Sequence, residues 1–116
     1  MDRPALNEEE RGARQQLSNL LRLVLSNHCS YLEAAPWVVH LRSRVGGVGD
    51  FDDDFRVFVG INSETDHLPT QATRHLWAAH ALKALEPEMA RLEARAAALA
   101  RVSCEALLAR FDETGA

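Results

Sequence analysis

Apolar residues near the start of the chain recur every three or four positions, which is the spacing of one face of an α-helix. Asn7 can cap the start of this helix, and Glu8, Glu9 and Glu10 follow in the first turn, where carboxylates meet the positive end of the helix dipole. The pattern fades near Ser26-Asn27. We therefore predict a first helix over this stretch, with a face formed by Ala13, Leu17, Leu20, Leu21, Val24 and His28.

Prolines and glycines divide the next stretch. Residues 30–33 have the spacing of a capping box, but Pro36 lacks an N–H and its ring crowds the carbonyl four residues earlier. We predict a short turn or kink there, then a helix from about Pro36 to Val45 that ends at the glycine-rich turn 46–49.

The second half of the chain predicts two further helices. Pro69 suits the first turn of a helix that continues to about Leu85, and Glu86-Pro87-Glu88 predicts a break and a new start. The last helix then extends from about Pro87 to Phe111. Its apolar positions repeat as a heptad-like seam formed by Met89, Leu92, Ala96, Leu99, Ser103 and Ala106.

Residues 51–61 fit two patterns. Phe55, Val57, Val59 and Ile61 alternate as in a strand, whereas the aspartates at 52–54 suit a helix start. A lone strand would leave its backbone groups without partners, and no convincing second strand is present in the sequence. We predict a helix here; a short strand remains the alternative.

Composition supports a helical protein. Alanine (18) and leucine (16) dominate the apolar residues, and both are strong helix formers. A chain of 116 residues is long enough for one modest core. We predict a single all-α domain over residues 1–116, a compact bundle of four to five helices with a long C-terminal helix.

Charge and cysteine usage narrow the function classes. The formal net charge is −4 and the arginines are interleaved with acids, which disfavours nucleic-acid binding. The N-terminus lacks the apolar region of a secretory signal, and no apolar run is long enough to span a bilayer. We therefore expect a cytoplasmic protein without membrane association, in which Cys29 and Cys104 are reduced and packed inside.

The densest group of polar side chains lies between residues 62 and 69, directly after an apolar run. Glu64, Asp66 and His67 fall in this block, and Arg74 and Trp77 follow it. We predict that these five residues form a binding surface, with Arg74 organising the carboxylates. Most of the aromatic residues lie between positions 31 and 77 and are expected to support it from beneath: Tyr31, Trp37, Phe51, Phe55, Phe58 and Trp77. The plain structural reading is that the block only caps a helix and closes a turn.

Other candidate chemistry is weaker. Asp50, Asp52, Asp53 and Asp54 lack the spacing of an EF-hand and suit a solvated helix start that could attract a basic partner. The five histidines do not have zinc-site spacing, and no nucleotide-binding or nucleophile motif is present. We predict no catalytic residue, no metal and no cofactor.

One segment resembles a known family. Its motif is Phe-x-x-Phe-Val-x-Ile-x-Ser-Glu-Thr-Asp-x-Leu-Pro-(x)4-Arg-x-x-Trp, beginning at Phe55 and ending at Trp77. This motif is similar to that of a family of small bacterial proteins of unknown function, over about residues 31 to 111. The resemblance implies a bacterial source and brings no activity with it.

Three hypotheses of function follow. The leading one is a non-enzymatic binding module, immunity-like in that it would neutralise or regulate another protein, with aromatic anchors beside charge. The second is a small hydrolase or lyase that uses Glu64, Asp66 or His67. The third is a structural homodimer joined through the last helix.

Overall fold

The computed structural model describes residues 7–49, 52–65, 67–68 and 74–111. These residues form α1 (Glu8–Leu25), α2 (Tyr31–Arg42), α3 (Asp53–Thr65), the short 3-10 turn η1 (Arg74–Leu76) and α4 (Ala79–Phe111). The prediction of an all-α bundle with a long C-terminal helix is confirmed. The helix predicted at 51–61 is also confirmed, and the strand alternative for that stretch is wrong.

Helix α1 begins as its sequence predicts. The Asn7 side chain accepts a hydrogen bond from the Glu10 N–H (2.7 Å), and the Glu10 carboxylate accepts one from the Asn7 N–H (3.1 Å). This reciprocal capping box satisfies two donors that a helix start leaves without partners. The helix ends at Leu25, close to the predicted end.

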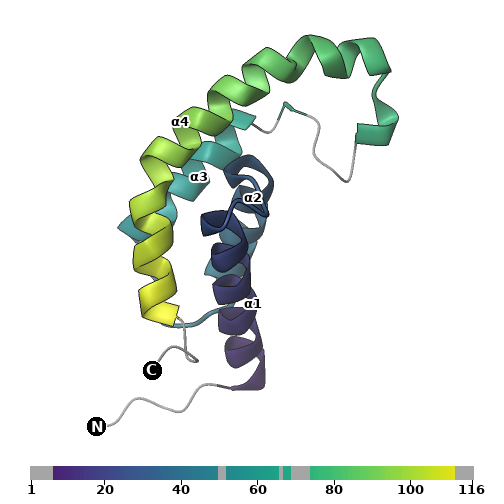
Figure 1. Ribbon diagram of the computed structural model, residues 1–116. Helices are drawn as coiled ribbons and strands as arrows, with labels where there is room; N and C mark the ends of the chain where they lie inside the picture. Colours follow the sequence, from purple (N-terminus) through teal and green to yellow (C-terminus); the bar gives the residue numbers. More distant parts are fainter. Residues whose placement is uncertain (1–6, 50–51, 66, 69–73, 112–116) are drawn as a thin grey trace, which may run out of the picture.

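Both predicted proline breaks are wrong. Pro36 lies inside α2, which already begins at Tyr31, and Pro87 lies inside α4. A proline inside a helix removes one backbone hydrogen bond, and its ring crowds the carbonyl four residues earlier, so it costs stability and can bend the helix. In α2 the loss is offset by capping at the N-terminus and by the burial of Ala34, Ala35, Val38 and Leu41. In α4, Figure 1 shows the helix arching, so that its first part projects beyond the bundle as an arm.

The start of α4 also differs from the prediction. The helix that was expected from Pro69 begins only at Ala79, after the single turn η1. Residues 69–73 lie outside the described part of the chain. The arm therefore consists of the first turns of α4, in which most side chains are exposed or only half-buried.

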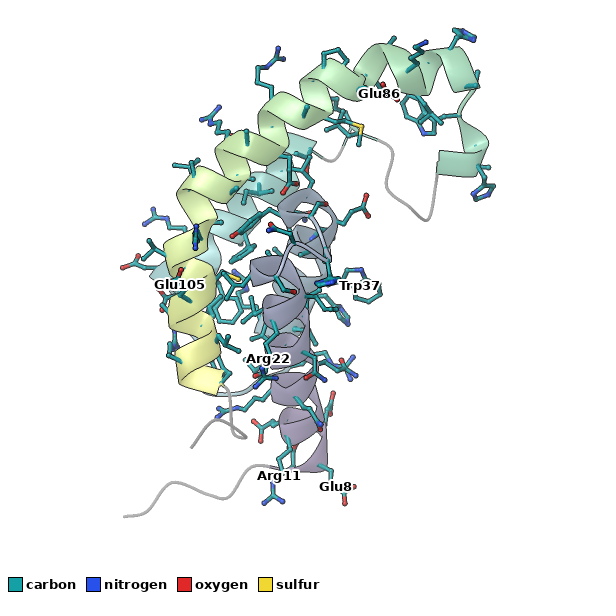
Figure 2. All side chains as sticks on the ribbon, in the orientation of Figure 1. Glu8, Arg11, Arg22, Trp37, Glu86 and Glu105 are labelled. Carbon is teal, nitrogen blue, oxygen red and sulfur yellow. The ribbon has the colours of Figure 1, made fainter. Side chains whose placement is uncertain are left out.

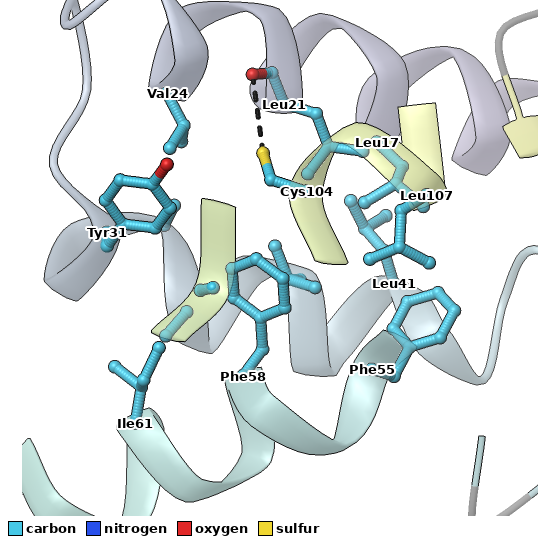
Figure 3. Close-up of a cluster of buried hydrophobic side chains, with 14 of the residues drawn as sticks. Leu17, Leu21, Val24, Tyr31, Leu41, Phe55, Phe58, Ile61, Cys104 and Leu107 are labelled. Carbon is cyan, nitrogen blue, oxygen red and sulfur yellow. Dashed lines mark hydrogen bonds between the residues drawn. The ribbon is translucent and has the colours of Figure 1, made fainter. Parts of the chain in front are cut away.

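The core lies where α2 packs against α1 and α3 and where the second half of α4 packs against all three (Figure 3). Phe55 and Phe58 from α3 are its largest fully buried side chains. The side chains that α4 contributes are Ala96, Ala100, Cys104, Leu107 and Phe111. The predicted seam of α4 is thus only partly correct, because Leu99 points outward and the buried row is rotated towards Ala100.

The conformation of the glycine-rich turn after α2 depends on the glycine backbone and on contacts with α1. Gly46 and Gly47 have φ angles of +77° and +73°, which glycine adopts without strain. A side chain at Gly46 would also collide with the Glu10 carboxylate. Arg14 of α1 donates hydrogen bonds to the carbonyls of Val45 (2.7 Å) and Gly46 (3.1 Å), and this holds the turn against the bundle.

Candidate functional site

The predicted polar block forms the end of α3 and the turn after it. The Thr65 hydroxyl donates to the Ile61 carbonyl (2.7 Å), and the Leu68 N–H donates to the Thr65 carbonyl (3.0 Å). Leu68 is buried, whereas Glu64 and His67 on either side of the turn are exposed. These local hydrogen bonds occupy Thr65 and Leu68 and leave the Glu64 and His67 side chains at the surface. Asp66 lies outside the described residues.

Glu64 and His67 each meet a charged side chain of α4. Glu64 Oε1 lies 3.9 Å from the Arg95 guanidinium, and His67 Nε2 lies 2.9 Å from Glu88 Oε1. We call these four residues the charged strip. Their side chains are 34% to 63% exposed, so each pair is screened by solvent and is worth well under about 1 kcal/mol. The strip connects the end of α3 to the middle of α4 while remaining reachable from outside.

The other two predicted residues lie elsewhere. Arg74 begins η1, which Figure 1 places out on the arm, away from the end of α3; its side chain is outside the described part. Arg95 is instead the arginine that faces Glu64. Trp77 is 38% exposed and its neighbour Leu76 is 74% exposed, so the tryptophan belongs to the arm.

The aromatic residues that were expected beneath the polar block therefore lie in several different places. Tyr31, Phe55 and Phe58 are buried in the core as predicted. Trp37 is exposed, and Figure 2 shows it at the outer surface of the bundle. Phe51 lies outside the described residues. Within the described chain, the apolar side chains beside Glu64 and Arg95 are aliphatic, and Ile61 and Leu92 are among them.

The space beside the charged strip is too small for a substrate. A cavity of about 10 Å³ lies between α3 and α4, lined in part by Ile61, Glu64, Leu92 and Arg95. Such a volume holds about one water molecule, whereas sites for small molecules usually measure about 300–1,000 Å³. The strip is a surface feature, and it offers acid–base chemistry no enclosed pocket at this position.

The acidic start of α3 has an internal partner. Arg110 of α4 donates to both carboxylate oxygens of Asp52 and to Asp54, each at 2.9 Å. The Asp52 side chain also accepts from the Asp54 N–H (3.1 Å). Asp53 is exposed and Asp50 lies outside the described residues. The cluster that suggested attraction of a basic partner thus ties α3 to the end of α4.

This tie predicts a pH dependence of stability. The hydrogen bonds from Arg110 hold the pKa of Asp52 below its ordinary value, against the opposing effect of burial. A lowered folded-state pKa stabilises the fold above the unfolded-state pKa of about 3.9, and that contribution is lost as the pH falls through the folded-state pKa. We expect Asp52→Asn to flatten the fall in unfolding free energy between about pH 5 and pH 2, measured by urea denaturation.

Asp53→Asn is the matched control, because Asp53 starts the same helix and does not contact Arg110 in the described structure. It should leave the pH profile close to that of the parent protein. An Asp52→Asn profile as steep as the parent's would show that the Arg110 pair contributes nothing to acid sensitivity.

The two cysteines are poor nucleophiles. Cys104 is buried and directs its thiol to the Leu21 carbonyl (3.7 Å), and burial raises its pKa to about 12. The pKa of Cys29 is also raised, first by burial and then by Glu33 and Glu93. Both thiols are free; Cys104 is buried as predicted, whereas Cys29, between α1 and α2, is only half-buried. Since the thiolate is the reactive form, neither is prepared for covalent catalysis.

No group of three or more metal-ligating side chains occurs among the described residues. Within the same part of the chain, no helix is both long and apolar enough to cross a membrane.

Sequence reasoning missed the partners that lie on other helices. Glu88 and Arg95 are seven residues apart on α4 and so occupy one side of the helix, but nothing in their local sequence links them to α3. Glu93, between them in sequence but on another side of α4, accepts hydrogen bonds from the N–H groups of Tyr31 (2.8 Å) and Leu32 (3.0 Å) at the start of α2. These residues become visible only once the helices are placed together.

Comparisons of the chain with protein-family models, with curated proteins and with solved structures find no match. The resemblance to a family of small bacterial proteins therefore stays a prediction.

Proposed function

We propose that this chain is a protein-binding module that neutralises or regulates a partner protein without catalysis. The charged strip would form the contact surface, together with exposed residues of the arm such as Trp77. The observation that carries the proposal is that all four strip side chains are at least one-third exposed, beside a cavity of only about 10 Å³ in the described part of the chain.

The chemistry of the surface suits a protein partner with basic groups. Glu64 and Glu88 supply two carboxylates, and the pairs with Arg95 and His67 that now hold them are weak enough to be exchanged for a partner's cations. Trp77 adds a partly exposed aromatic side chain, and tryptophan is among the residues that most often dominate binding energy. Charge would guide approach, and the ring would supply apolar contact.

The charge contribution can be tested by neutralising both carboxylates. We expect Glu64→Gln with Glu88→Gln to reduce capture of the partner about tenfold or more, because loss of charge contacts worth about 1.4 kcal/mol gives that factor. The immobilised protein would be exposed to a lysate of its source organism, and the captured protein quantified by mass spectrometry. The thermal midpoint should change little, since both pairs are exposed.

Glu8→Gln with Asp53→Asn is the matched control, with the same change in net charge at two exposed sites outside the strip. Trp77→Ala should also weaken capture, whereas Trp37→Ala removes an equally large, more exposed ring from another surface. If all four variants capture the same amount of partner as the parent, the strip is only a connection between α3 and α4 and the proposal is wrong.

A further inference from the structure

The side of α4 next to α3 carries a row of mostly apolar residues, the first of which also line the small cavity between the two helices. Leu99 is 56% exposed and Val102 is 76% exposed, although both lie in the part of α4 that packs on the bundle. Positions on this side of α4 alternate at spacings of three and four residues, as in the contact seam of a coiled coil. We call this row the outer face of α4: Leu92, Arg95, Leu99, Val102, Ala106 and Ala109.

We propose that the outer face of α4 binds the same face of a second copy of this chain, with the two helices antiparallel. A row shared by two identical chains is self-complementary under a two-fold axis, the commonest symmetry of protein dimers. In the antiparallel register, Leu99 of each copy lies opposite Val102 of the other, next to the axis. The two most exposed apolar side chains of this face would then cover each other.

Side-chain size fits this register along the whole row. Moving outward from the axis, Arg95 faces Ala106 of the second copy, and Leu92 faces Ala109. Each long side chain therefore meets a small one, which is the alternation that lets facing helices pack closely. A parallel arrangement would place Arg95 against Arg95 and Ala106 against Ala106, with like charges in contact at one layer and a gap at another.

Charge favours the same register. Glu105 neighbours Ala106 and lies within one residue's rise, about 1.5 Å, of the level of Arg95 in the second copy. Both side chains are more than half exposed and are held only weakly within the monomer. Glu105 pairs with Arg101 at 3.3 Å, and Arg95 reaches Glu64 only at 3.9 Å. An antiparallel dimer would add two symmetry-related Arg95–Glu105 pairs at its edges.

The size of the contact limits its strength. The row from Leu92 to Ala109 spans about 26 Å of helix, and one pair of helices of that length buries less than a standard interface of about 1,600 Å². We therefore expect reversible dimers with a dissociation constant on the order of 10–100 µM.

Sedimentation equilibrium from about 10 µM to about 1 mM tests the proposal. The weight-average mass should rise from that of one 12.9 kDa chain towards twice that value. Val102→Glu should weaken the dimer at least about tenfold, because it buries a charge beside the two-fold axis. Leu23→Glu is the matched control, an exposed leucine of α1 that should leave dimerisation unchanged. Circular dichroism at the lowest concentration should show the same helix content for all three proteins.

Charge reversal tests the register. Arg95→Glu alone should weaken the dimer, and Arg95→Glu with Glu105→Arg should restore it, because the pair between copies is then inverted. If the double variant does not regain the dimerisation of the parent protein, the antiparallel register is wrong.

Two other outcomes would overturn the proposal itself: a chain that stays monomeric to about 1 mM, or a Val102→Glu protein that dimerises as well as the parent. This face would then be left to a partner of another sequence. The two surfaces share Arg95, but Val102 lies outside the charged strip and Glu64 and Glu88 lie outside the outer face, so the Val102→Glu result and the capture result can fail separately.

Discussion

Replacing Phe58 by alanine should remove most of the stability of this protein. Phe58 is fully buried on α3, and its ring lies in the middle of the side chains that the four helices share (Figure 3). Truncating a buried phenylalanine usually costs about 3–5 kcal/mol, from lost burial and from the cavity left behind. Small domains are stable by only about 5–15 kcal/mol in total, so we expect a large shift in the urea midpoint and partial unfolding at 37 °C.

Trp37→Ala provides the control for this measurement. It removes a larger aromatic side chain from the surface of α2, where the ring is mostly exposed and meets only the edge of His40. We expect a loss of no more than about 1 kcal/mol. Equal losses in the two variants would mean that the core is not organised around α3. Both variants remove an aromatic ring from a helix, so the difference between their losses of unfolding free energy measures the effect of burial.

Local signals in the sequence predicted the start of α1 and the capping residue of α2, although not the starts expected at Pro36, Pro69 and Pro87. The Asn7–Glu10 box and the Ser30 cap, whose hydroxyl accepts from the Glu33 N–H at 3.0 Å, depend on residues three positions apart, and the structure has both. Pro36 and Pro87 led to wrong breaks, because the rule for proline weighs one lost hydrogen bond and cannot weigh the packing that keeps the helix intact.

The orientation of α4 could not be settled from sequence because alanine is apolar on every side of the helix. Ala96 belongs to the predicted seam and is buried, but the core then continues through Ala100 and Cys104 while Leu99 turns outward. A leucine normally marks the buried side, and here the small residues allow closer approach of α1 and α3 instead. Leu99 and Val102 are left exposed, whereas Leu107 and Phe111 further along α4 are buried.

The sequence predicted only two of the four residues of the charged strip. Glu64 and His67 were recognisable as charged groups in an exposed turn, which is local information. Glu88 and Arg95 come from a helix whose contact with α3 depends on the whole fold, so their role required coordinates. Arg74 was chosen as the organising arginine because it is near in sequence, yet η1 lies on the arm and Arg95 occupies the place beside Glu64.

Among the contacts between helices that the sequence did not predict, the one made by Glu93 is the strongest. Its removal should cause the second-largest loss of folding stability. Its carboxylate accepts one hydrogen bond from each of the first two N–H groups of α2, which would otherwise lack protein acceptors. It also places a negative charge at the positive end of the α2 dipole. We expect Glu93→Ala to lower the free energy of unfolding by about 2–4 kcal/mol, since hydrogen bonds to charged groups contribute about 1.5–3 kcal/mol each and are not fully additive.

Glu93→Gln should cost less, about 1–2 kcal/mol, because its amide keeps one acceptor oxygen but turns an N–H₂ group towards the second backbone donor. Replacing Glu86, an exposed glutamate of the same helix, by alanine should change stability by less than about 0.5 kcal/mol.

Hydrogen exchange measures the effect of Glu93 on the start of α2 directly. In Glu93→Ala, the Tyr31 and Leu32 amides should exchange faster than global unfolding explains. If these two amides stay as protected as in the parent protein, another group caps α2 and the long-range role of Glu93 is refuted. Faster exchange confined to these amides would show that α4 positions the start of α2 from sixty residues away in sequence.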